Sequence, residues 1–169
     1  MGAQPAKRID AHFIAAGKYH DIDHPRLEML RLLAEHPNIR TTVACDYSGL
    51  DRLAHCRFLI TYTCDLMPTV EQAAQLRAWV EAGGKWLALH GTNSILVFTE
   101  SGLVDAPDDR PDVMEMLGTQ FKAHPPIGPF HVEVVNRDHE FTRGIENFDV
   151  VDELYLSHTT APIDTLMQT

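Results

Sequence analysis

Cysteine, basic residues and long apolar runs are all scarce in this sequence of 169 residues. The three cysteines, Cys45, Cys56 and Cys64, are odd in number and lack CxxC spacing, so the sequence predicts neither a disulfide framework nor a thiolate zinc site. No apolar run approaches the roughly 18 residues that a membrane span needs. We therefore expect free or buried thiols and no membrane association.

The charge balance is acidic and argues against one large class of partner. Lys and Arg together number 14 against 24 for Asp and Glu, a formal net charge of -10. The basic residues are scattered rather than gathered into a stripe that follows phosphates, so we expect no nucleic-acid partner. Residues 1–13 contain no apolar stretch long enough for a signal peptide, which favours a cytoplasmic location.

Length and composition indicate one soluble globular domain. Hydrophobic residues make up 44% of the chain and charged residues 22%, which is ordinary for such proteins. A chain of this length is sufficient for one hydrophobic core and short for two. We therefore predict a single domain over residues 1–169.

Apolar runs alternate with amphipathic segments in the first half of the chain. One predicted helix, at 25–34, places Leu27, Leu30 and Leu33 on one face, and a second is capped by Thr69 and ended by Gly83. The predicted strands are residues 9–17, 39–45, 57–63 and 85–89. Because these strands are apolar throughout, we predict a mostly parallel sheet covered on both faces, a three-layer α/β/α sandwich.

The second half of the chain has a weaker pattern. We expect a long acidic loop over 94–112, a short helix over 113–121 and a proline-rich loop over 123–129. Strands are predicted at 130–136 and 150–156.

Polar residues follow each strand of the predicted parallel sheet, and this edge is where ligands bind in such sheets. Four of the strand ends supply imidazoles, carboxylates, thiols or amides, namely Tyr19, His20, Asp21, Asp23 and His24, then Asp46 and Tyr47, then Cys64 and Asp65, and finally His90, Thr92 and Asn93. Imidazoles with a carboxylate suit zinc or a similar ion, and they equally suit general acid and base steps on a polar substrate. Both uses remain open at this point.

His90 stands where an apolar strand meets a glycine-containing turn, in the stretch WLALHGTNS. This is the geometry of a nucleophile elbow, in which the residue at the tip projects above the sheet. The turn has neither Cys nor Ser at its tip, so we do not expect nucleophilic acyl transfer. Further along the chain, His124 precedes two prolines that hold it rigidly, and Asp138, His139, Asp152, Glu153 and Tyr155 add further polar candidates.

Several segments together resemble the ThuA-like (trehalose utilisation) family, whose members are related to the class I glutamine amidotransferases. They are YHD with a following His, AGGKWLALHG, MLGTQFKAHP, VEVVNRDHEFTRGI and FDVVDELY. The resemblance spans nearly the whole chain and implies a flavodoxin-like core. It also implies a role in the metabolism of trehalose or another sugar.

The resemblance places family-type residues at His20, Asp21, His24, His90, Gly91, His124, Pro125, Asp138, His139, Asp152, Glu153 and Tyr155. The amidotransferase cysteine has no counterpart, because the elbow carries His90 and Gly91 instead. The resemblance therefore implies that the chain is not a functional glutamine amidotransferase. Family members also continue beyond the DELY segment, which implies a chain truncated at its C-terminus.

Two functions of different class follow. The first is a metal-assisted hydrolase or isomerase acting on a sugar or keto-sugar, with a divalent metal, zinc or similar, as cofactor. For it we assign the catalytic roles to His90, His124, Asp21 and Glu153, substrate binding to Tyr19, Asn93, Tyr155 and His139, and metal binding to His20, His24 and His90. The second is a non-catalytic module that binds a carbohydrate or a partner subunit. In either case we expect a small-molecule carbohydrate as ligand and a homodimer as the assembly.

Overall fold

The computed structural model describes residues 6–169. The sequence predicts that residues 1–13 contain no signal peptide. The first five residues of this segment lie outside the described residues. Within the described residues, no helix is both long and apolar enough to cross a membrane.

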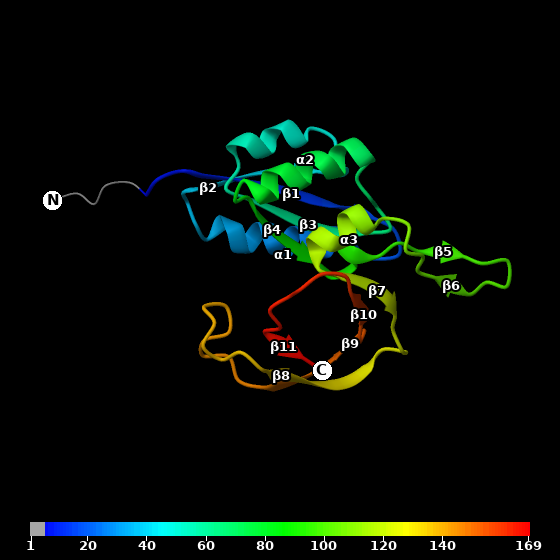
Figure 1. The fold of residues 1–169 in the computed structure, drawn as a ribbon. Helices are drawn as coiled ribbons and strands as arrows, with labels where there is room; N and C mark the ends of the chain where they lie inside the picture. The colour runs from blue at the N-terminus through cyan, green and yellow to red at the C-terminus, as the bar shows by residue number, and fades with distance from the viewer. Residues whose placement is uncertain (1–5) are drawn as a thin grey trace.

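A parallel sheet forms the centre of the first half of the chain (Figure 1). Its strands are β1 (Ile9–Gly17), β2 (Ile39–Ala44), β3 (Phe58–Cys64) and β4 (Lys85–Leu89), arranged in the order β2-β1-β3-β4. Every neighbouring pair in this sheet is parallel. The α/β prediction is confirmed, and the carboxyl ends of the four strands lie at one edge.

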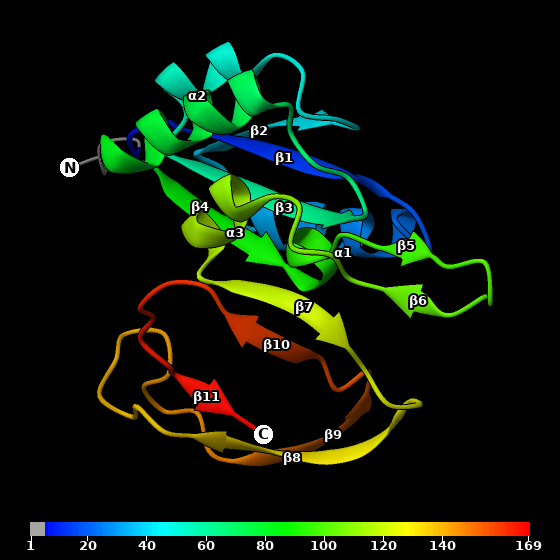
Figure 2. The same ribbon diagram turned by 45° about the vertical axis from the view of Figure 1, so that its right-hand side comes forward.

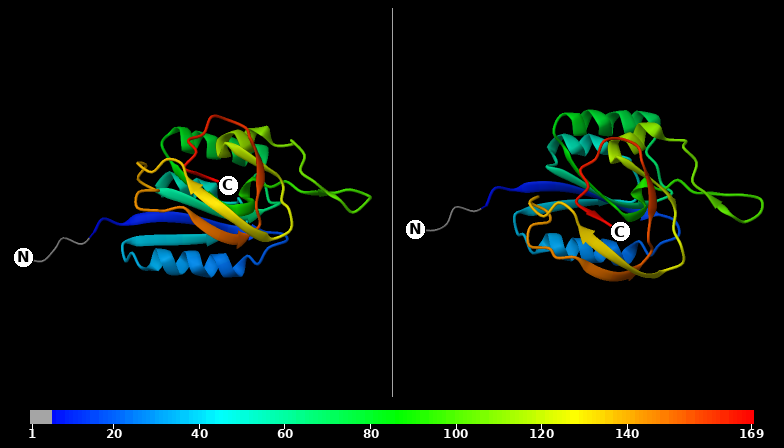
Figure 3. Two further views of the ribbon diagram at one scale, coloured as in Figure 1. Left: turned by 90° about the horizontal axis from the view of Figure 1, so that it is seen from below. Right: turned by 60° about the horizontal axis from the view of Figure 1, so that its bottom comes forward.

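Helices cover both faces of this sheet, as Figure 3 shows from below. Helix α1 (Asp23–Ala34) packs on the face formed by Phe13, Ala15 and Ile60, while α2 (Val70–Glu81) and the short helix η1 (Leu50–His55) pack on the face of Ile14 and Leu59. The alternation of Phe13 and Ile14 along β1 divides the core into two clusters, because successive strand residues point to opposite faces. The predicted helix face of α1 is only partly correct, since Leu27 is 48% exposed.

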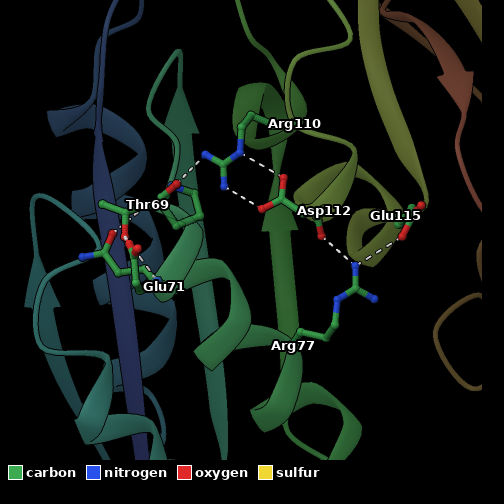
Figure 4. A network of polar contacts seen from close by, with 8 residues as sticks. Thr69, Glu71, Arg77, Arg110, Asp112 and Glu115 are labelled. Atoms are coloured by element: carbon green, nitrogen blue, oxygen red, sulfur yellow. Dashed lines mark hydrogen bonds and ion pairs between the residues drawn. The ribbon is translucent and has the colours of Figure 1, made fainter.

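Local signals in the sequence fix the position of α2. Thr69 and Gln72 form a reciprocal capping box, in which the Thr69 hydroxyl accepts from the Gln72 N–H and the Gln72 side chain accepts from the Thr69 N–H. Figure 4 shows how the short helix α3 (Pro111–Leu117) is tied to this region. Arg110 pairs with Asp112 and donates to the Pro68 carbonyl, and Arg77 of α2 donates to the Asp112 carbonyl.

Antiparallel strands dominate the second half of the chain and lie beside the parallel sheet (Figure 2). Strand β7 (Thr119–Ala123) pairs with β10 (Leu156–Thr159), and β8 (Gly128–Val134) lies between β9 (Phe148–Asp152) and β11 (Met167–Gln168). A short hairpin of β5 (Val97–Phe98) and β6 (Val104–Asp105) extends away from both units. The antiparallel strands β7 to β11, here called the antiparallel unit, bring a second set of polar loops to the carboxyl edge of the parallel sheet.

Three predictions for the second half are wrong in detail. The helix predicted to reach residue 121 ends at Leu117, because Gly118 takes the left-handed conformation with a φ of 79° and strand β7 follows. The predicted strand over 150–156 is two strands, β9 and β10, separated by residues 153–155. The predicted loop over 94–112 contains the β5–β6 hairpin. The helix end follows from Gly118 and the hairpin from local pairing of β5 with β6, whereas the division into β9 and β10 follows from their pairing with different strands, β8 and β7.

Candidate functional site

His90 lies on a tight turn between β4 and the short helix η2 (His90–Asn93). Its φ is 50°, in the left-handed region that non-glycine residues rarely occupy. The turn is held closely: a Cβ on Gly91 would lie 2.9 Å from the Cys64 Cβ, and the Thr92 hydroxyl donates to the Leu89 carbonyl at 2.9 Å. The geometry of an elbow is present, with an imidazole at its tip.

His20 lies in the loop after β1, and a second close approach fixes that loop. Gly17 has a φ of 126°, and a Cβ there would lie 2.3 Å from the Cys64 carbonyl oxygen. The next residue, Lys18, donates its N–H to that same oxygen at 3.0 Å. The His20 Nδ1 lies 3.2 Å from the Lys18 carbonyl oxygen. A carbonyl only accepts hydrogen bonds, so Nδ1 is the donor in this contact, and Nε2 is the ring nitrogen that faces the site.

Glu153 and Tyr155 come from the antiparallel unit, in the loop that joins β9 to β10. The Tyr155 hydroxyl lies 3.0 Å from the His90 Nε2 and 3.4 Å from the His20 Nε2. The Tyr155 ring stacks on His90 with centroids 4.7 Å apart. This loop therefore faces the edge of the parallel sheet and closes the site from the other side.

His20, His90 and Glu153 form a compact cluster of possible metal ligands. The Glu153 Oε2 lies 3.7 Å from the His20 Nε2 and 3.6 Å from the His90 Nε2. One ligand atom from each residue lies within 4.8 Å of the others. All three side chains are partly buried, with 17%, 26% and 22% of their surfaces exposed for His20, His90 and Glu153.

The surroundings control which of these groups hold protons. Burial lowers the pKa of His90, assisted by the proximity of His20 and opposed by Glu153, so its neutral form is favoured. Burial together with the Glu153 carboxylate raises the pKa of Tyr155 far above its usual value, which keeps the phenol protonated. Burial also raises the pKa of the Cys64 thiol to about 11, so Cys64 is no thiolate nucleophile at neutral pH.

An aromatic cavity of about 420 Å³ opens beside the cluster. Its walls include the rings of Tyr19, Phe98, Phe121 and Tyr155, and His20 and Glu153 of the cluster also line it. Tyr19 and Phe98 contact each other with ring centroids 5.4 Å apart. Flat aromatic walls beside a few polar groups provide surfaces on which a sugar ring can stack.

The structure brings most of the predicted site residues to this place. His20, His90 and Glu153 form the cluster, Tyr155 contacts both of its imidazoles, and Tyr19 and His124 line the aromatic cavity. His124 is exposed, its Nδ1 lies 2.9 Å from the Pro125 carbonyl oxygen, and its ring stacks 6.0 Å from Tyr155.

Four predicted residues lie outside the cluster. Asp21 is exposed, and its carboxylate accepts from the N–H groups of Asp23 and His24 at 3.1 and 3.2 Å, at the start of α1. His24 is exposed on the first turn of that helix and is not among the three clustered ligands. Glu153, predicted from the sequence as a catalytic group, is the third residue of the cluster instead.

The other two are Asn93 and His139. The Asn93 side-chain nitrogen donates to the Thr119 hydroxyl at 3.0 Å, and its buried oxygen has no hydrogen-bond partner within the described residues. His139 lies in the turn between β8 and β9, where its Nδ1 accepts from the Phe141 N–H. That turn is at the opposite end of the β8–β9 pair from Asp152 and Glu153.

Sequence reasoning missed two walls of the cavity, Phe98 and Phe121. Phe98 belongs to a segment predicted to be a loop and Phe121 to one predicted to be a helix. Gly118, a residue type that commonly ends helices, is the local signal that could have placed Phe121 beyond the helix. The strand that carries Phe98 has only two residues, too few for a pattern to reveal it.

Comparison with known proteins agrees with this arrangement. The family described as ThuA, trehalose utilisation, matches residues 13–169. A putative ThuA-like protein from Bacteroides uniformis ATCC 8492 has a similar structure, with a TM-score of 0.67 and 17% identity over 93% of this chain and 64% of that chain. One from Parabacteroides merdae ATCC 43184 gives a TM-score of 0.67 and 12% identity over 88% of this chain and 63% of that one.

The chain thus spans a little under two thirds of the length of these two structures, and at such identity the likeness concerns the fold. No curated protein matches the sequence. The family match, in contrast, covers almost all of the sequence and includes every residue of the cluster. The chain belongs to the ThuA (trehalose utilisation) family.

Proposed function

We propose that this protein is an enzyme that acts on a small carbohydrate with the help of a divalent metal ion held by His20, His90 and Glu153. The observation that carries the proposal is the convergence of these three ligand atoms within 4.8 Å at the edge of the parallel sheet. The family description supports a carbohydrate as the substrate.

The residues fit a metal such as zinc in both chemistry and spacing. Two imidazoles and one carboxylate are a donor set of catalytic zinc sites, which keep a further position open. With zinc bonds of about 2.0–2.1 Å, the ligand atoms of a tetrahedral site lie about 3.3 Å apart. The distances of 3.6 and 3.7 Å from Glu153 to the two imidazoles need only a small contraction. The bond from His20 Nδ1 to the Lys18 carbonyl is the kind of support that orients metal-binding histidines.

A bound divalent ion would withdraw electron density from a carbonyl or hydroxyl oxygen of the sugar, which serves hydrolysis and the isomerisation of a keto-sugar alike. The protein supplies the rest. Tyr155 keeps its proton and presents its hydroxyl to the imidazoles, where it can donate a hydrogen bond to a substrate oxygen. The rings of Tyr19 and Phe121 hold the sugar ring and exclude water from one side.

Metal content and turnover together test the proposal. Protein purified without a chelator is expected to contain about one equivalent of a divalent metal by mass spectrometry of the elements. His20→Ala and His90→Ala are expected to lose that metal and, with it, the turnover of trehalose or keto-sugars. His24→Ala is the matched control, because it removes an imidazole from the same loop region but from outside the cluster.

The results separate the two functions that the sequence left open. Loss of metal in His24→Ala to the same extent as in His90→Ala would overturn the ligand set. Sugar binding measured by calorimetry without any turnover would instead favour the second function, a non-catalytic carbohydrate-binding module. The absence of a Cys or Ser nucleophile at the elbow is the feature that favours this function. Absence of both metal and sugar binding would leave only an interaction role.

A further inference from the structure

A second cavity, of about 670 Å³, reaches the same cluster from the side of the sheet that α1 covers. It shares two lining residues, His20 and Glu153, with the aromatic cavity, and His90 lines it as well. The two cavities therefore adjoin at these side chains, one on each side of the cluster.

The walls of the second cavity are largely apolar. They are formed by Phe13, Met29, Leu32, Leu89 and Ile127, from β1, α1, β4 and the loop before β8. Leu32 is 54% exposed and Ile127 is 67% exposed, so this apolar surface is open to solvent in the absence of a ligand. Apolar side chains that gather in a concave surface next to a polar site indicate a binding region for an apolar group.

The cavity also has polar lining residues besides the cluster itself. His24 and Glu28 lie on α1, and Asp152 lies next to Glu153. The carboxylates of Glu28, Asp152 and Glu153 disfavour an anionic ligand, and the net charge of -10 acts in the same direction. The cavity therefore suits an uncharged apolar group attached to whatever occupies the cluster.

We propose that the second cavity binds the apolar aglycone, aryl or short alkyl, of a glycoside whose sugar ring lies in the aromatic cavity. The bond between sugar and aglycone then lies beside His20 and Glu153. This inference rests on the proposed function, because it takes the aromatic cavity as the sugar site. It adds that, among the sugars that the site accepts, glycosides with an apolar aglycone bind best.

Paired ligands that differ only in the aglycone test the proposal. Phenyl and methyl glucosides, each as α and β anomers, are titrated into the metal-loaded protein by calorimetry. A phenyl ring buries about 100 Å² or more of apolar surface, so the better phenyl glucoside is expected to bind at least about tenfold tighter than the methyl glucoside of the same anomer. Equal affinities within each pair would overturn the proposal.

Two substitutions on α1 provide a matched comparison. Leu32 and Leu27 are 54% and 48% exposed, and only Leu32 lines the cavity. Leu32→Ser is expected to weaken phenyl glucoside binding by roughly threefold to tenfold, with the methyl glucoside unaffected. Leu27→Ser is expected to change neither affinity. Because both side chains are exposed, both variants are expected to fold.

The outcomes distinguish failure of this inference from failure of the proposed function. If metal binds and neither glucoside does, the aglycone assignment fails while the metal site stands. If metal is absent as well, both fail. A change of oligomeric state in Leu32→Ser, by sedimentation and without any change in glucoside affinity, would identify this surface as a contact between copies of the chain and overturn the proposal.

Discussion

The cluster is assembled from two regions that differ in how firmly they hold their residues. His20 and His90 stand at the edge of the parallel sheet, on turns pressed against Cys64 at Gly17 and Gly91. Glu153 and Tyr155 stand on a three-residue loop between two antiparallel strands.

At the sheet edge, the close contacts of Gly17 and Gly91 with Cys64 leave no room for an added methyl group. The loop of Glu153 and Tyr155 is held by the pairing of β10 with β7 and by the contacts of Tyr155 with the two imidazoles. Substitutions of the edge glycines Gly17 and Gly91 should therefore act through stability, whereas substitutions of Glu153 and Tyr155 in the loop should act through ligand binding.

The largest effect is expected from Gly17→Ala, at the sheet edge. The new Cβ would lie 2.3 Å from the Cys64 carbonyl oxygen and 2.6 Å from the Cys64 nitrogen, and backbone atoms cannot move aside as a side chain can. We expect a loss of about 3 kcal/mol in the free energy of unfolding, or roughly 6–12 °C in Tm by thermal denaturation. Gly83→Ala is the control, because Gly83 has a φ of 96° with nothing within 4 Å. Equal losses in the two variants would contradict the importance of the contact with Cys64.

The second effect is expected from Glu153→Gln, in the loop. The change removes the negative charge from the cluster and keeps the side-chain volume, so metal affinity is expected to fall roughly 30-fold, about 2 kcal/mol, with Tm of the metal-free protein nearly unchanged. Competition with a chromophoric chelator measures it. Asp152→Asn makes the same change one residue away, at an exposed position, and is expected to have little effect. A large drop in Tm for Glu153→Gln would show that the loop is structural after all.

A smaller effect is expected from Gly118→Ala, where the antiparallel unit begins. Gly118 has a φ of 79°, and a Cβ there would lie 2.5 Å from the Ile163 Cγ2, a side-chain end that can move. We expect a loss of about 1.5 kcal/mol in the free energy of unfolding, mostly from the left-handed backbone. Gly144→Ala, at a φ of 82° with nothing within 4 Å, is expected to lose only about 1 kcal/mol. Denaturant unfolding of both variants makes the comparison.

The smallest effect is expected from Tyr155→Phe, and its sign is informative. The Tyr155 hydroxyl, which burial and Glu153 keep protonated, forms a hydrogen bond of 3.0 Å with the His90 Nε2. A metal must displace this hydrogen bond, so its removal is expected to tighten metal binding by up to about fivefold, roughly 1 kcal/mol. Tyr62→Phe is the control, because the Tyr62 ring stacks on His90 with centroids 5.5 Å apart. Weaker metal binding in Tyr155→Phe would make the phenol a supporting group of the metal site.

Sequence reasoning placed His20 and His90 together for a sound physical reason. Parallel strands end at the same edge, so residues that follow β1 and β4 meet there whatever lies between them in the chain. Nothing local could distinguish Glu153 from Asp21 or His24 as the third group near them. Asp21 accepts from the first N–H groups of α1, a use that becomes visible only when the start of that helix is known.

The sequence by itself determined the α/β/α core, because apolar strands, a capped helix and terminating glycines are local properties of the chain. It also determined that an imidazole, with no cysteine, stands at the elbow. Only the tertiary structure decided that the loop between β9 and β10 completes the cluster and that two cavities of different character meet at it. The reason is that the pairing of β7 with β10 joins residues more than 30 positions apart, and no periodicity within either segment specifies its partner.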